Sequence, residues 1–537
     1  MVKWLCGNPS RLPLLLAIYF IAHVLVRTFV SGTLDYDESE QAFLSQFFQL
    51  GYNSQPPLYT WLQRGTFETI GYSVVSLALL KNIFIWLTYV LVFEAIRQAT
   101  GKVQLGLVAS LGMLLIPQVS WESHRDLSHT VAAMFATSLL IYCVVMMAKG
   151  VSVGVATRWY VLLGFTVGIG ALFKYNFALV VLGILISAVS VTRYRKAVLD
   201  WRLLLSISIT LVMVMPHLVW MTQNFGLAST KTVNTLTGGQ SEVWIANVSK
   251  GLVSLSVSIL ACIVGPVLMF ALGLGRNRPS RVTDRDLGSL EIETRYLLER
   301  FLIVILFILV MMVVVGQAVE FENRWLQPFI FLVPAWLTLT YSSLLLEQLR
   351  FQRNLCRLSI GVMAVILFVI ILRPFTASYR GKYTRLNVPY PMAAEMIYEQ
   401  EGDAPRLIFT RDMRDAGNLL IRFPDRLILC EEAPHLIGES NRIRLSTDSK
   451  VWAFTASGST EGLSDFGVHI RSVLNLPVER TFPIQQLSVP YLHGKNGDAK
   501  TFWFSAISLD TDVVAADQIM LEPSRFDQAS SGQSEVR

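Results

Sequence analysis

Three acidic side chains crowd the chain just after its first long apolar run. The segment Leu34-Asp-Tyr-Asp-Glu38 contains them, and Glu40 follows two residues later. Crowded carboxylates favour protonation of one member or recruitment of a cation. A carboxylate at a membrane surface also has the chemistry of a general base, which takes a proton from an acceptor hydroxyl. A solvated acidic start of a loop is the alternative explanation.

A second cluster brings an acid, an imidazole and a guanidinium together. It reads Trp121-Glu-Ser-His-Arg-Asp126 and occupies a short polar break between two apolar runs. Because the break is short, these side chains stay at the membrane surface, on the side predicted for Asp37. Taken alone, such a cluster is more often a charged loop than a site.

Cations suited to a phosphate occur at three further polar breaks. Arg324 lies in Glu320-Phe-Glu-Asn-Arg-Trp-Leu-Gln-Pro328, beside an apolar run, where it either snorkels to the interface or grips an anion. The guanidinium matches the geometry of a phosphate, and lipid phosphates sit at this depth. Lys81 and Lys174 could share this task, although snorkelling explains each lysine taken alone.

A double proline opens another candidate element, Gln55-Pro-Pro-Leu-Tyr-Thr-Trp61. The prolines stiffen the entry to the amphipathic stretch that follows. Tyr59 and Trp61 suit the headgroup level of a membrane, where aromatic rings are enriched. A purely interfacial anchor is the alternative explanation of the two aromatic side chains.

The elements that must position these side chains are membrane-spanning helices. Of the 537 residues, 53% are hydrophobic and 16% are charged, whereas a soluble chain carries about 25% charged residues. Up to residue 373 the chain alternates polar breaks with apolar runs of about 17 to 25 residues, which suffice to cross roughly 30 Å of hydrocarbon as helices. We expect about eleven spans, near residues 12–30, 82–99, 103–120, 128–148, 159–174, 176–192, 203–221, 251–273, 301–318, 326–347 and 357–373.

Basic residues gather at the ends of the apolar runs on one side of this topology. The largest groups are Arg193-Tyr-Arg-Lys196 and the stretches 276–300 and 350–357. The positive-inside rule then puts the N-terminus in the cytoplasm and, with an odd number of spans, the C-terminus outside. This placement accounts for the net charge of +6 without nucleic acid as a partner. No Ala-x-Ala cleavage site follows the apolar stretch 12–30, so we expect an uncleaved first span.

Two segments that interrupt the spans allow a prediction of their local structure. The first outer loop, 31–81, contains amphipathic stretches at Gln41–Leu50 and Leu58–Ile70, which suit helices lying at the interface. Lys174-Tyr-Asn176 is either a tight hairpin between two helices or a polar site inside one long helix. Only the hairpin keeps the later loops on their assigned sides.

From about residue 376 the apolar runs shorten and the charge rises, which indicates a domain outside the membrane. Short buried strands are predicted at 406–410, 426–430, 451–455 and 502–508, and a helix at 412–422. We therefore expect a transmembrane domain over 1–375, an extracytoplasmic α/β domain over 376–525 and a disordered tail over 526–537. The five scattered cysteines indicate neither a disulfide framework nor a metal cluster.

Together these motifs resemble the polytopic lipid-linked glycosyltransferases of the GT-C fold. The resemblance rests on the Asp37-Glu38 pair, on Pro56-Pro-Leu-Tyr-Thr-Trp61 and on Asp126 at the opening of the fourth span. The family includes the dolichyl-phosphate-mannose protein mannosyltransferases and the bacterial aminoarabinose and galacturonic acid transferases that act on lipid A. Asn323–Pro328 is similar to the family's Arg-Tyr-x-x-Pro element. The likeness covers residues 12 to about 345, and the outer domain only by its placement.

The resemblance implies an inverting transfer from a polyprenyl-phosphate sugar, with no metal ligand assigned and a divalent metal left open. It makes Asp37 the base, with Glu38 and Asp126 orienting the acceptor or the sugar. Arg324 would hold the carrier phosphate as it leaves, because a preorganised cation lowers the barrier where charge builds up.

One position departs from the family pattern. Members often carry Lys or His directly before the Pro-Pro pair, whereas this chain has Gln55. A neutral amide can hydrogen-bond a phosphate or a sugar but adds no charge, so Lys81, Arg125 or Lys174 would compensate. This departure leaves the identity of the sugar open. The candidates for positioning substrate are then Gln55, Tyr59, Trp61 and His124.

We therefore predict a helical multi-span membrane enzyme that moves a sugar from a polyprenyl-phosphate carrier to a lipid, glycan or protein acceptor at the outer face. A bacterial inner membrane is favoured, because the chain shows no endoplasmic reticulum retention signal and no disulfide framework in its outer domain. A secondary transporter is the alternative, but we find no internal repeat, and the polar clusters lie at one surface rather than midway. A scaffold that binds a partner would not need Asp37, Asp126 and Arg324 together.

Overall fold

The chain forms two compact units, each of which is described by itself. The first comprises Met1–Val24, Gln49–Tyr59 and Leu79–Phe368, and the second comprises Leu25–Phe48, Thr60–Ala78 and Val369–Arg537. The computed structural model describes residues 2–150, 153–238, 240, 243–274, 289–316, 318–402, 405–436, 450–456, 466–468, 470–471 and 483–508. The predicted tail, 526–537, lies outside these residues.

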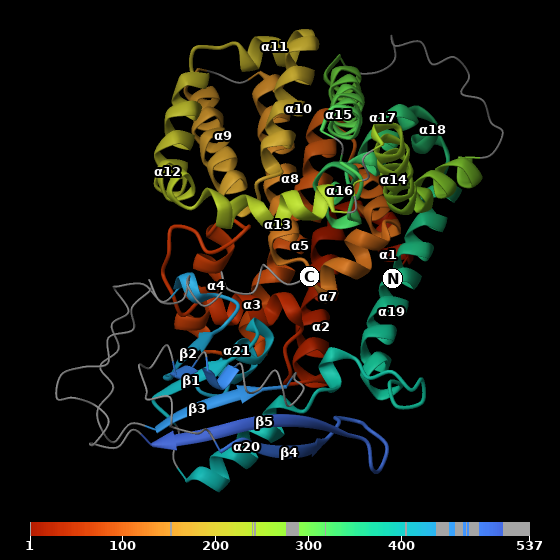
Figure 1. Cartoon of the computed structure of the whole chain (residues 1–537). Helices are drawn as coiled ribbons and strands as arrows, with labels where there is room; N and C mark the ends of the chain where they lie inside the picture. Colours follow the sequence, from red (N-terminus) through yellow and green to blue (C-terminus); the bar gives the residue numbers. More distant parts are fainter. Residues whose placement is uncertain are drawn as a thin grey trace. The chain divides into compact units, whose positions relative to one another are not determined.

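The first unit is a helical bundle (Figure 1). Helices α2, α4, α5 and α19 also continue into the second unit. The helices are α1 (Val2–Gly7), α2 (Leu12–Val30), α4 (Leu58–Ile70), α5 (Val74–Thr100), α6 (Val103–Gly112), α7 (Ser123–Arg125), α8 (Ser128–Lys149), α9 (Val153–Phe173), α10 (Phe177–Ser190), α11 (Thr192–Val198), α12 (Leu203–Gln223), α13 (Phe225–Thr237), α14 (Trp244–Leu274), α15 (Ser289–Val314), α16 (Asn323–Ile330), α17 (Val333–Thr340), α18 (Ser342–Glu347) and α19 (Leu349–Phe375).

Seven helices of the described chain are long and apolar enough to cross a membrane. They are Pro9–Val30, Val74–Thr100, Ser128–Lys149, Leu203–Gln223, Trp244–Leu274, Ser289–Val314 and Leu349–Phe375. Their surfaces carry large exposed apolar side chains, such as Ile18 and Ile21 on α2, each 58% exposed. A soluble protein rarely exposes such continuous apolar surface, so these faces meet lipid. The multi-span helical membrane fold is thereby confirmed.

Of the other four predicted spans, two are the shorter apolar helices Thr157–Phe173 and Phe177–Ser190 and two are interrupted, so the count of eleven stays a prediction. The run 103–120 consists of two helical segments, Val103–Leu115 and Gln118–Arg125, which are bent by 79°. Residues 326–347 divide into α16, α17 and α18, with proline inside α16 and in the first turn of α17. Proline removes a helical hydrogen bond and clashes with the preceding turn, which favours such breaks.

Helices α9 and α10 are separate, as the hairpin alternative for Lys174–Asn176 predicts. Helix α9 ends at Phe173 and α10 begins at Phe177. The two helices approach closely, because a Cβ atom at Gly170 would lie 2.2 Å from the ring of Phe177. The break therefore leaves three polar residues between two apolar helices.

The second unit contains a five-stranded mixed sheet, with the strand order β2-β1-β3-β5-β4 visible in Figure 1. Its strands are β1 (Leu407–Thr410), β2 (Leu427–Cys430), β3 (Lys450–Thr455), β4 (Gln485–Pro490) and β5 (Ala499–Ser508). Strands β2 and β3 both run parallel to β1, whereas β5 is antiparallel to β3 and to β4. Helices α3 (Tyr36–Leu44), α20 (Tyr390–Glu401) and α21 (Met413–Leu420) lie wholly within this unit.

The four predicted strands and the predicted helix of the outer domain are confirmed as β1, β2, β3, β5 and α21. Helix α20 and strand β4 were not predicted. Strand β4 has the sequence Gln-Gln-Leu-Ser-Val-Pro, buries only Val489 and ends in Pro490. A polar edge strand that ends in proline is typical of sheet margins, but it lacks the apolar run by which the other strands were recognised.

Helices α3 and α21 meet almost backbone to backbone in the second unit. A Cβ atom at Gly417 of α21 would lie 2.1 Å from the carbonyl oxygen of Ser39 on α3. Asn418 strengthens the contact, because its Oδ1 accepts the backbone N–H of Leu34 at 2.8 Å and its Nδ2 donates to Ser39 Oγ at 3.2 Å. Helix α21 therefore fixes the segment that carries the acidic motif.

Substituting alanine for Gly417 is expected to destabilise this contact by about 1–3 kcal/mol, because the added methyl group forces the two backbones apart. Thermal unfolding of the purified chain and hydrogen exchange in α3 and α21 would measure the loss. Gly361→Ala is the matched control, because a Cβ atom there meets nothing within 4 Å. Equal effects of the two substitutions would contradict the close packing.

Asp415 of α21 carries a buried carboxyl group whose protonation affects stability. It is fully buried, accepts a hydrogen bond from the Tyr390 hydroxyl at 2.5 Å and another from the Ala456 N–H at 2.9 Å. Burial, with the nearby Asp412 carboxylate, raises the pKa of Asp415 from 3.8 to about 7. Between these two values the folded protein holds a proton that the unfolded chain has lost.

The stability of the second unit is therefore expected to fall as the pH rises from about 4 to about 7, by roughly 4 kcal/mol at most. Asp415→Asn should remove this dependence and stabilise the unit above pH 7. Hydrogen exchange in β3 and α21 at pH 5 and pH 8 would test it, with Asp425→Asn, on the loop before β2, as control. If the wild-type exchange rate, corrected for intrinsic exchange, did not change between pH 5 and pH 8, the role given to Asp415 would be contradicted.

Candidate active site

Polar residues from four predicted motifs meet in the first unit through hydrogen bonds. The amine of Lys81 donates to the carbonyl of His124 at 3.3 Å. The amine of Lys174 donates to Thr130 Oγ1, in the first turn of α8, at 2.5 Å. The first bond joins α5 to α7, and the second joins α8 to the break between α9 and α10.

The Asn323–Pro328 motif joins the same set of contacts. Asn176 Nδ2 donates to the carbonyl of Trp325 at 3.0 Å. Gln327 Nε2 donates to Ser123 Oγ at 2.7 Å and to the carbonyl of Gln118 at 2.9 Å. Within this unit, the segments around Lys81, His124, Lys174 and Trp325 therefore form one neighbourhood.

The backbone around Asp126 has an unusual conformation. Residues Gln118–Glu122 form a turn of π-helix, and Leu127 has a φ of 78°. The π-turn is frequent at functional sites, and a left-handed conformation is strained for a residue with a branched side chain. Leu127 is nevertheless buried, so the surrounding packing holds the strain. Asp126 therefore lies between the π-turn and the strained Leu127, two residues before the start of α8.

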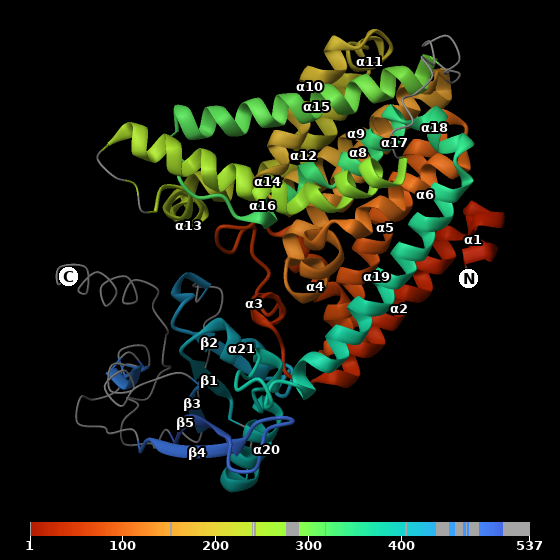
Figure 2. The same ribbon diagram turned by 90° about the vertical axis from the view of Figure 1, so that its right-hand side faces the viewer.

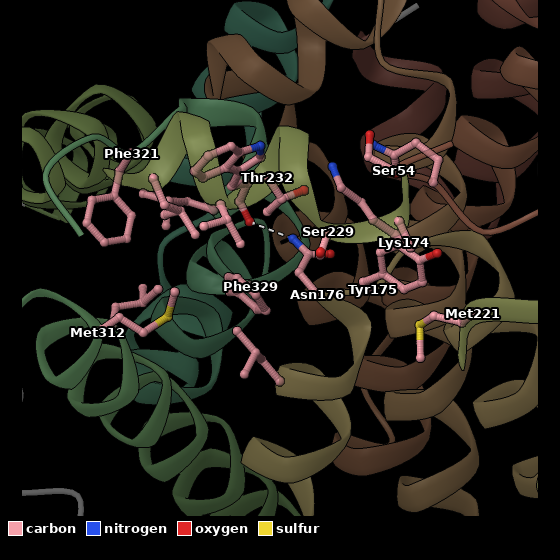
Figure 3. A pocket seen from close by; sticks show the side chains of 18 of the residues that line it. Ser54, Lys174, Tyr175, Asn176, Met221, Ser229, Thr232, Met312, Phe321 and Phe329 are labelled. Atoms are coloured by element: carbon pink, nitrogen blue, oxygen red, sulfur yellow. Dashed lines mark hydrogen bonds between the residues drawn. The ribbon is translucent and has the colours of Figure 1, made fainter. Parts of the chain in front are cut away.

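An elongated cavity of about 440 Å³ adjoins this neighbourhood. Figure 3 shows Lys174 and Ser54 at one end and Met312 and Phe321 at the other. Lys174 is the one charged side chain among the described lining residues. The lining residues are Ser54, Gln55, Lys174, Tyr175, Asn176, Leu179, Met221, Phe225, Ala228, Ser229, Thr232, Val233, Leu236, Leu309, Met312, Phe321, Trp325, Leu326 and Phe329. The cavity thus suits a ligand with an anionic head and a hydrocarbon chain.

One wall of the cavity belongs to α13, which the sequence analysis did not identify. Phe225, Ala228, Thr232 and Leu236 lie on successive turns of this helix and line the cavity. Their spacing of three or four residues is the signal that could have revealed it. The many Ser and Thr residues between them concealed the pattern.

Of the other site residues predicted for this unit, one lines the cavity, one is buried in the core and one is exposed. Gln55 lines the cavity, whereas Tyr59 is buried with its ring against Phe84 and His129. Arg324 is exposed and ion-paired with Glu322, next to the cavity-lining Trp325. Its role in holding the phosphate stays a prediction.

His124 is engaged with aromatic neighbours. Its ring stacks on that of His23, with centroids 3.6 Å apart and planes inclined by 8°, and Tyr19 and Phe20 lie around the pair. The guanidinium of Arg125 lies over the ring of Trp121, and its Nη1 is 3.4 Å from Oε2 of Glu122. His23 was missed because it lies inside an apolar run, where a single histidine carries no spacing signal.

In the second unit, the acidic motif begins α3 and is tied to arginines. Glu38 is 3% exposed, and Arg27 Nε donates to its two carboxylate oxygens at 3.0 and 3.2 Å. The same guanidinium donates to the carbonyls of Ser31 and Thr33 at 2.8 and 2.7 Å. Arg27 therefore fixes the turn that leads from α2 to α3.

Asp35 and Glu38 also form the N-terminal cap of α3. Asp35 is the capping residue, and Glu38 accepts the Asp35 backbone N–H at 3.0 Å, which completes a capping box. Arg385, from the C-terminal segment, pairs with Asp35 at 3.0 Å. Asp37, between the two capping residues, is partly exposed.

Carboxylates from the sheet domain lie near the same helix. Burial, with Glu40, Glu432, Asp37 and Asp412 nearby, raises the pKa of Tyr36 to about 12. The acidic motif therefore faces loops that follow β1 and β2 of the second unit. Trp61, also predicted to position substrate, stacks on Phe48 in this unit, with ring centroids 5.4 Å apart.

The basic partners of the acidic motif lie outside the loop that carries it. Arg27 lies in the last turn of the first span, and Arg385 lies 350 residues away along the chain. The described residues contain no group of three or more His, Cys, Asp or Glu side chains able to hold a metal ion. The use of a divalent metal stays open.

Comparison with known proteins now gives the family. The family model described as dolichyl-phosphate-mannose-protein mannosyltransferase matches residues 54–220. The lipopolysaccharide core galacturonosyltransferase RgtB of Rhizobium johnstonii is 33% identical over 92% of this chain and 97% of its own length. RgtA of the same organism, also a lipopolysaccharide core galacturonosyltransferase, is 30% identical over 90% of this chain and 95% of its own.

A solved structure has the same fold. ArnT from Cupriavidus metallidurans, in a crystal structure bound to undecaprenyl phosphate, aligns with a TM-score of 0.54 over 94% of this chain and 99% of its own, at 12% identity. With two relatives of at least 30% identity that are aligned over nearly their whole length, the chain belongs to the polytopic lipid-linked glycosyltransferase family of the GT-C fold, together with RgtB and RgtA.

Proposed function

We propose that this glycosyltransferase moves galacturonic acid from a polyprenyl-phosphate carrier to the core or lipid A part of lipopolysaccharide. The observation that carries the proposal is the elongated cavity, whose wall is mostly apolar and whose one charged side chain among the described lining residues, Lys174, lies at one end. Such a cavity fits a prenyl chain with a phosphate at one end. The names of RgtB and RgtA support the sugar and the acceptor.

The choice of carrier has a second line of support. ArnT, which shares the fold, has been crystallised with undecaprenyl phosphate. A phosphate sugar on this carrier is a phosphodiester with one negative charge, and its release produces a phosphate monoester with a further charge. Lys174 is buried, with 8% of its surface exposed, so its charge acts through a medium of low polarity and stabilises that developing charge strongly.

The proposed reaction is a direct displacement. The acceptor hydroxyl oxygen bonds to the anomeric carbon, while the bond from that carbon to the phosphate oxygen breaks and its electron pair leaves with the carrier. The hydroxyl proton passes to the carboxylate of Asp37. Attack opposite to the leaving phosphate inverts the anomeric configuration. Arg324, Lys81 and Arg125 would assist with the phosphate, and Asp126 would orient the sugar or the acceptor.

The fixed position of α3 supports Asp37 as the base. Glu38 and Asp35 are held by Arg27 and Arg385 and by the helix cap, whereas Asp37 is partly exposed between them. A base must reach the substrate, and the partly exposed carboxylate of Asp37 meets this condition better than the buried carboxylates of Asp35 and Glu38. We place the reaction at the periplasmic face of a bacterial inner membrane, with the N-terminus in the cytoplasm.

The test is an assay of the purified full chain in nanodiscs with two synthetic donors. Undecaprenyl-phosphate galacturonic acid and undecaprenyl-phosphate aminoarabinose are each offered with lipopolysaccharide that lacks galacturonic acid, and the products are identified by mass spectrometry. We expect transfer from the first donor and little from the second. Transfer from aminoarabinose alone would overturn the sugar assignment.

A nucleotide-linked donor gives the decisive control for the carrier. UDP-galacturonic acid has the same sugar but no hydrocarbon chain, so the cavity offers it little binding. Equal transfer from UDP-galacturonic acid, in the absence of any prenyl phosphate, would overturn the polyprenyl-phosphate donor while leaving the glycosyltransferase family unaffected.

A further inference from the structure

A second apolar groove, of about 180 Å³, lies between α8, α9, α10 and α12 of the first unit. It is separate from the cavity of Lys174, because the two share no lining residue. Its lining residues are Leu140, Val144, Leu163, Val167, Val181, Ile184, Leu185, Val198, Leu203, Ser206, Ile207, Thr210 and Leu211. Two of them, Val198 and Leu203, belong to the end of α11 and the beginning of α12.

The groove is open on the side that faces lipid. Leu185 is 37% exposed, Ile207 45% and Leu211 47%, although all three line it. The two hydroxyl groups in the wall are used, because Ser206 Oγ donates to the carbonyl of Tyr160 and Thr210 Oγ1 to the carbonyl of Gly164. The groove therefore offers a hydrocarbon surface to a hydrocarbon ligand.

The end of the groove at Val198 lies beside a basic helix. Helix α11 buries Tyr194, Ala197 and Val198 and exposes Arg195 and Lys196. It is anchored by Tyr160, whose hydroxyl donates to the carbonyl of Ala197 at 2.6 Å. Figures 1 and 2 both show α11 at the end of α10, beyond the parallel run of the long helices.

Nearby charges leave this end positive. Arg202 pairs with Asp200 at 2.7 Å, and Arg193 pairs with Glu293 at 3.7 Å. Arg158, two residues before Tyr160, is exposed together with Arg195 and Lys196.

The adjoining apolar side chains mark the level of the membrane interface. Trp201, between α11 and α12, is 77% exposed, and Leu199 is 67% exposed. Tryptophan is enriched at the headgroup level of a bilayer, where its ring meets lipid and its N–H meets water. The basic side chains of α11 are thus at the depth of lipid phosphates, while the groove extends from there among the helices.

We propose that this site binds one anionic phospholipid, with its phosphate against Arg195 and Lys196 and an acyl chain in the groove. Charge complementarity selects an anionic headgroup over a zwitterionic one, because each basic side chain near the surface attracts anionic lipid. The apolar wall of the groove favours a ligand with an acyl chain over free inorganic phosphate. The bound lipid fills the space between four helices and stabilises the first unit.

The test titrates the purified full chain in detergent with phosphatidylglycerol, with phosphatidylcholine of the same acyl chains and with inorganic phosphate. Thermal unfolding gives the rise in Tm, and native mass spectrometry gives the number of retained lipids and the apparent Kd. We expect one retained phosphatidylglycerol and a raised Tm, and no comparable effect of the other two ligands. Equal effects of phosphatidylglycerol and phosphatidylcholine would overturn the headgroup assignment.

Two variants separate the headgroup contact from the groove. Arg195→Gln with Lys196→Gln should weaken phosphatidylglycerol binding roughly thirtyfold, because it removes two charges. Arg353→Gln with Arg357→Gln, an exposed basic pair on α19, is the matched control and should leave binding unchanged. Loss of binding in the control as well would indicate general attraction to anionic lipid and overturn the site.

Ile207→Trp should fill the groove and abolish retention of the lipid chain. Val212→Trp on the same helix is the control, because Val212 is 77% exposed and does not line the groove. Unchanged lipid retention in Ile207→Trp, with the protein still folded, would overturn the groove as the binding place. The outcome does not depend on the proposed reaction, because every readout is binding or unfolding rather than sugar transfer.

Discussion

Asp37→Asn is expected to lower sugar transfer by about 10²–10⁴-fold while the protein stays folded. The substitution keeps the size of the side chain but removes the group that accepts the proton of the acceptor hydroxyl. Asp37 is partly exposed and lies outside the capping contacts of Asp35 and Glu38, so its loss should leave the start of α3 intact. Turnover at saturating donor and acceptor measures the effect.

The control for Asp37 is its neighbour on the same helix. Glu40→Gln removes a carboxylate one turn further along α3 and should keep most of the activity. Thermal unfolding of both variants would verify that they are folded. Near-normal turnover of Asp37→Asn, or an equal loss in Glu40→Gln, would remove Asp37 as the specific base.

Lys174→Met is expected to reduce turnover by about 10²–10³-fold and to raise the KM for the donor. The amine is the charged group of the described cavity lining, and methionine retains its length without its charge. The KM for the acceptor should change little, because the lysine is proposed to act on the carrier phosphate. Initial rates with each substrate varied separately measure the two constants.

Two further variants make the result specific to position and charge. Lys174→Arg keeps a cation and should recover part of the lost activity. Lys250→Met removes an exposed lysine from α14 and should have no effect. A rise in the acceptor KM equal to that of the donor would argue against the cavity as the donor site.

The membrane class and much of the C-terminal sheet domain could be predicted from the sequence, because both rest on apolar runs. Long runs produced the seven helices, and short runs produced β1, β2, β3 and β5. The breaks were harder, since proline in α16 and α17 divides a run that is continuous in composition. A hydropathy pattern reports how apolar a segment is and says little about where it bends.

The candidate site was predictable where charges interrupt apolar runs, as at Lys174 and the segment Trp121–Asp126. It was not predictable where contacts join residues far apart in the chain. Arg27 and Arg385 bind the acidic motif from a membrane helix and from the C-terminal segment, and the lining of α13 alternates with hydroxyl residues. Such partners become visible only when the chain is folded.

The single charged end of the cavity has a consequence for the catalytic cycle. On the proposed function, loaded and spent carriers would compete for Lys174, and the spent carrier would hold the lysine more strongly because its phosphate has the greater charge. Release of the empty carrier would then limit throughput, and its accumulation in the bilayer would slow the enzyme. Recycling of the carrier elsewhere in the cell would thus set the pace of surface glycosylation.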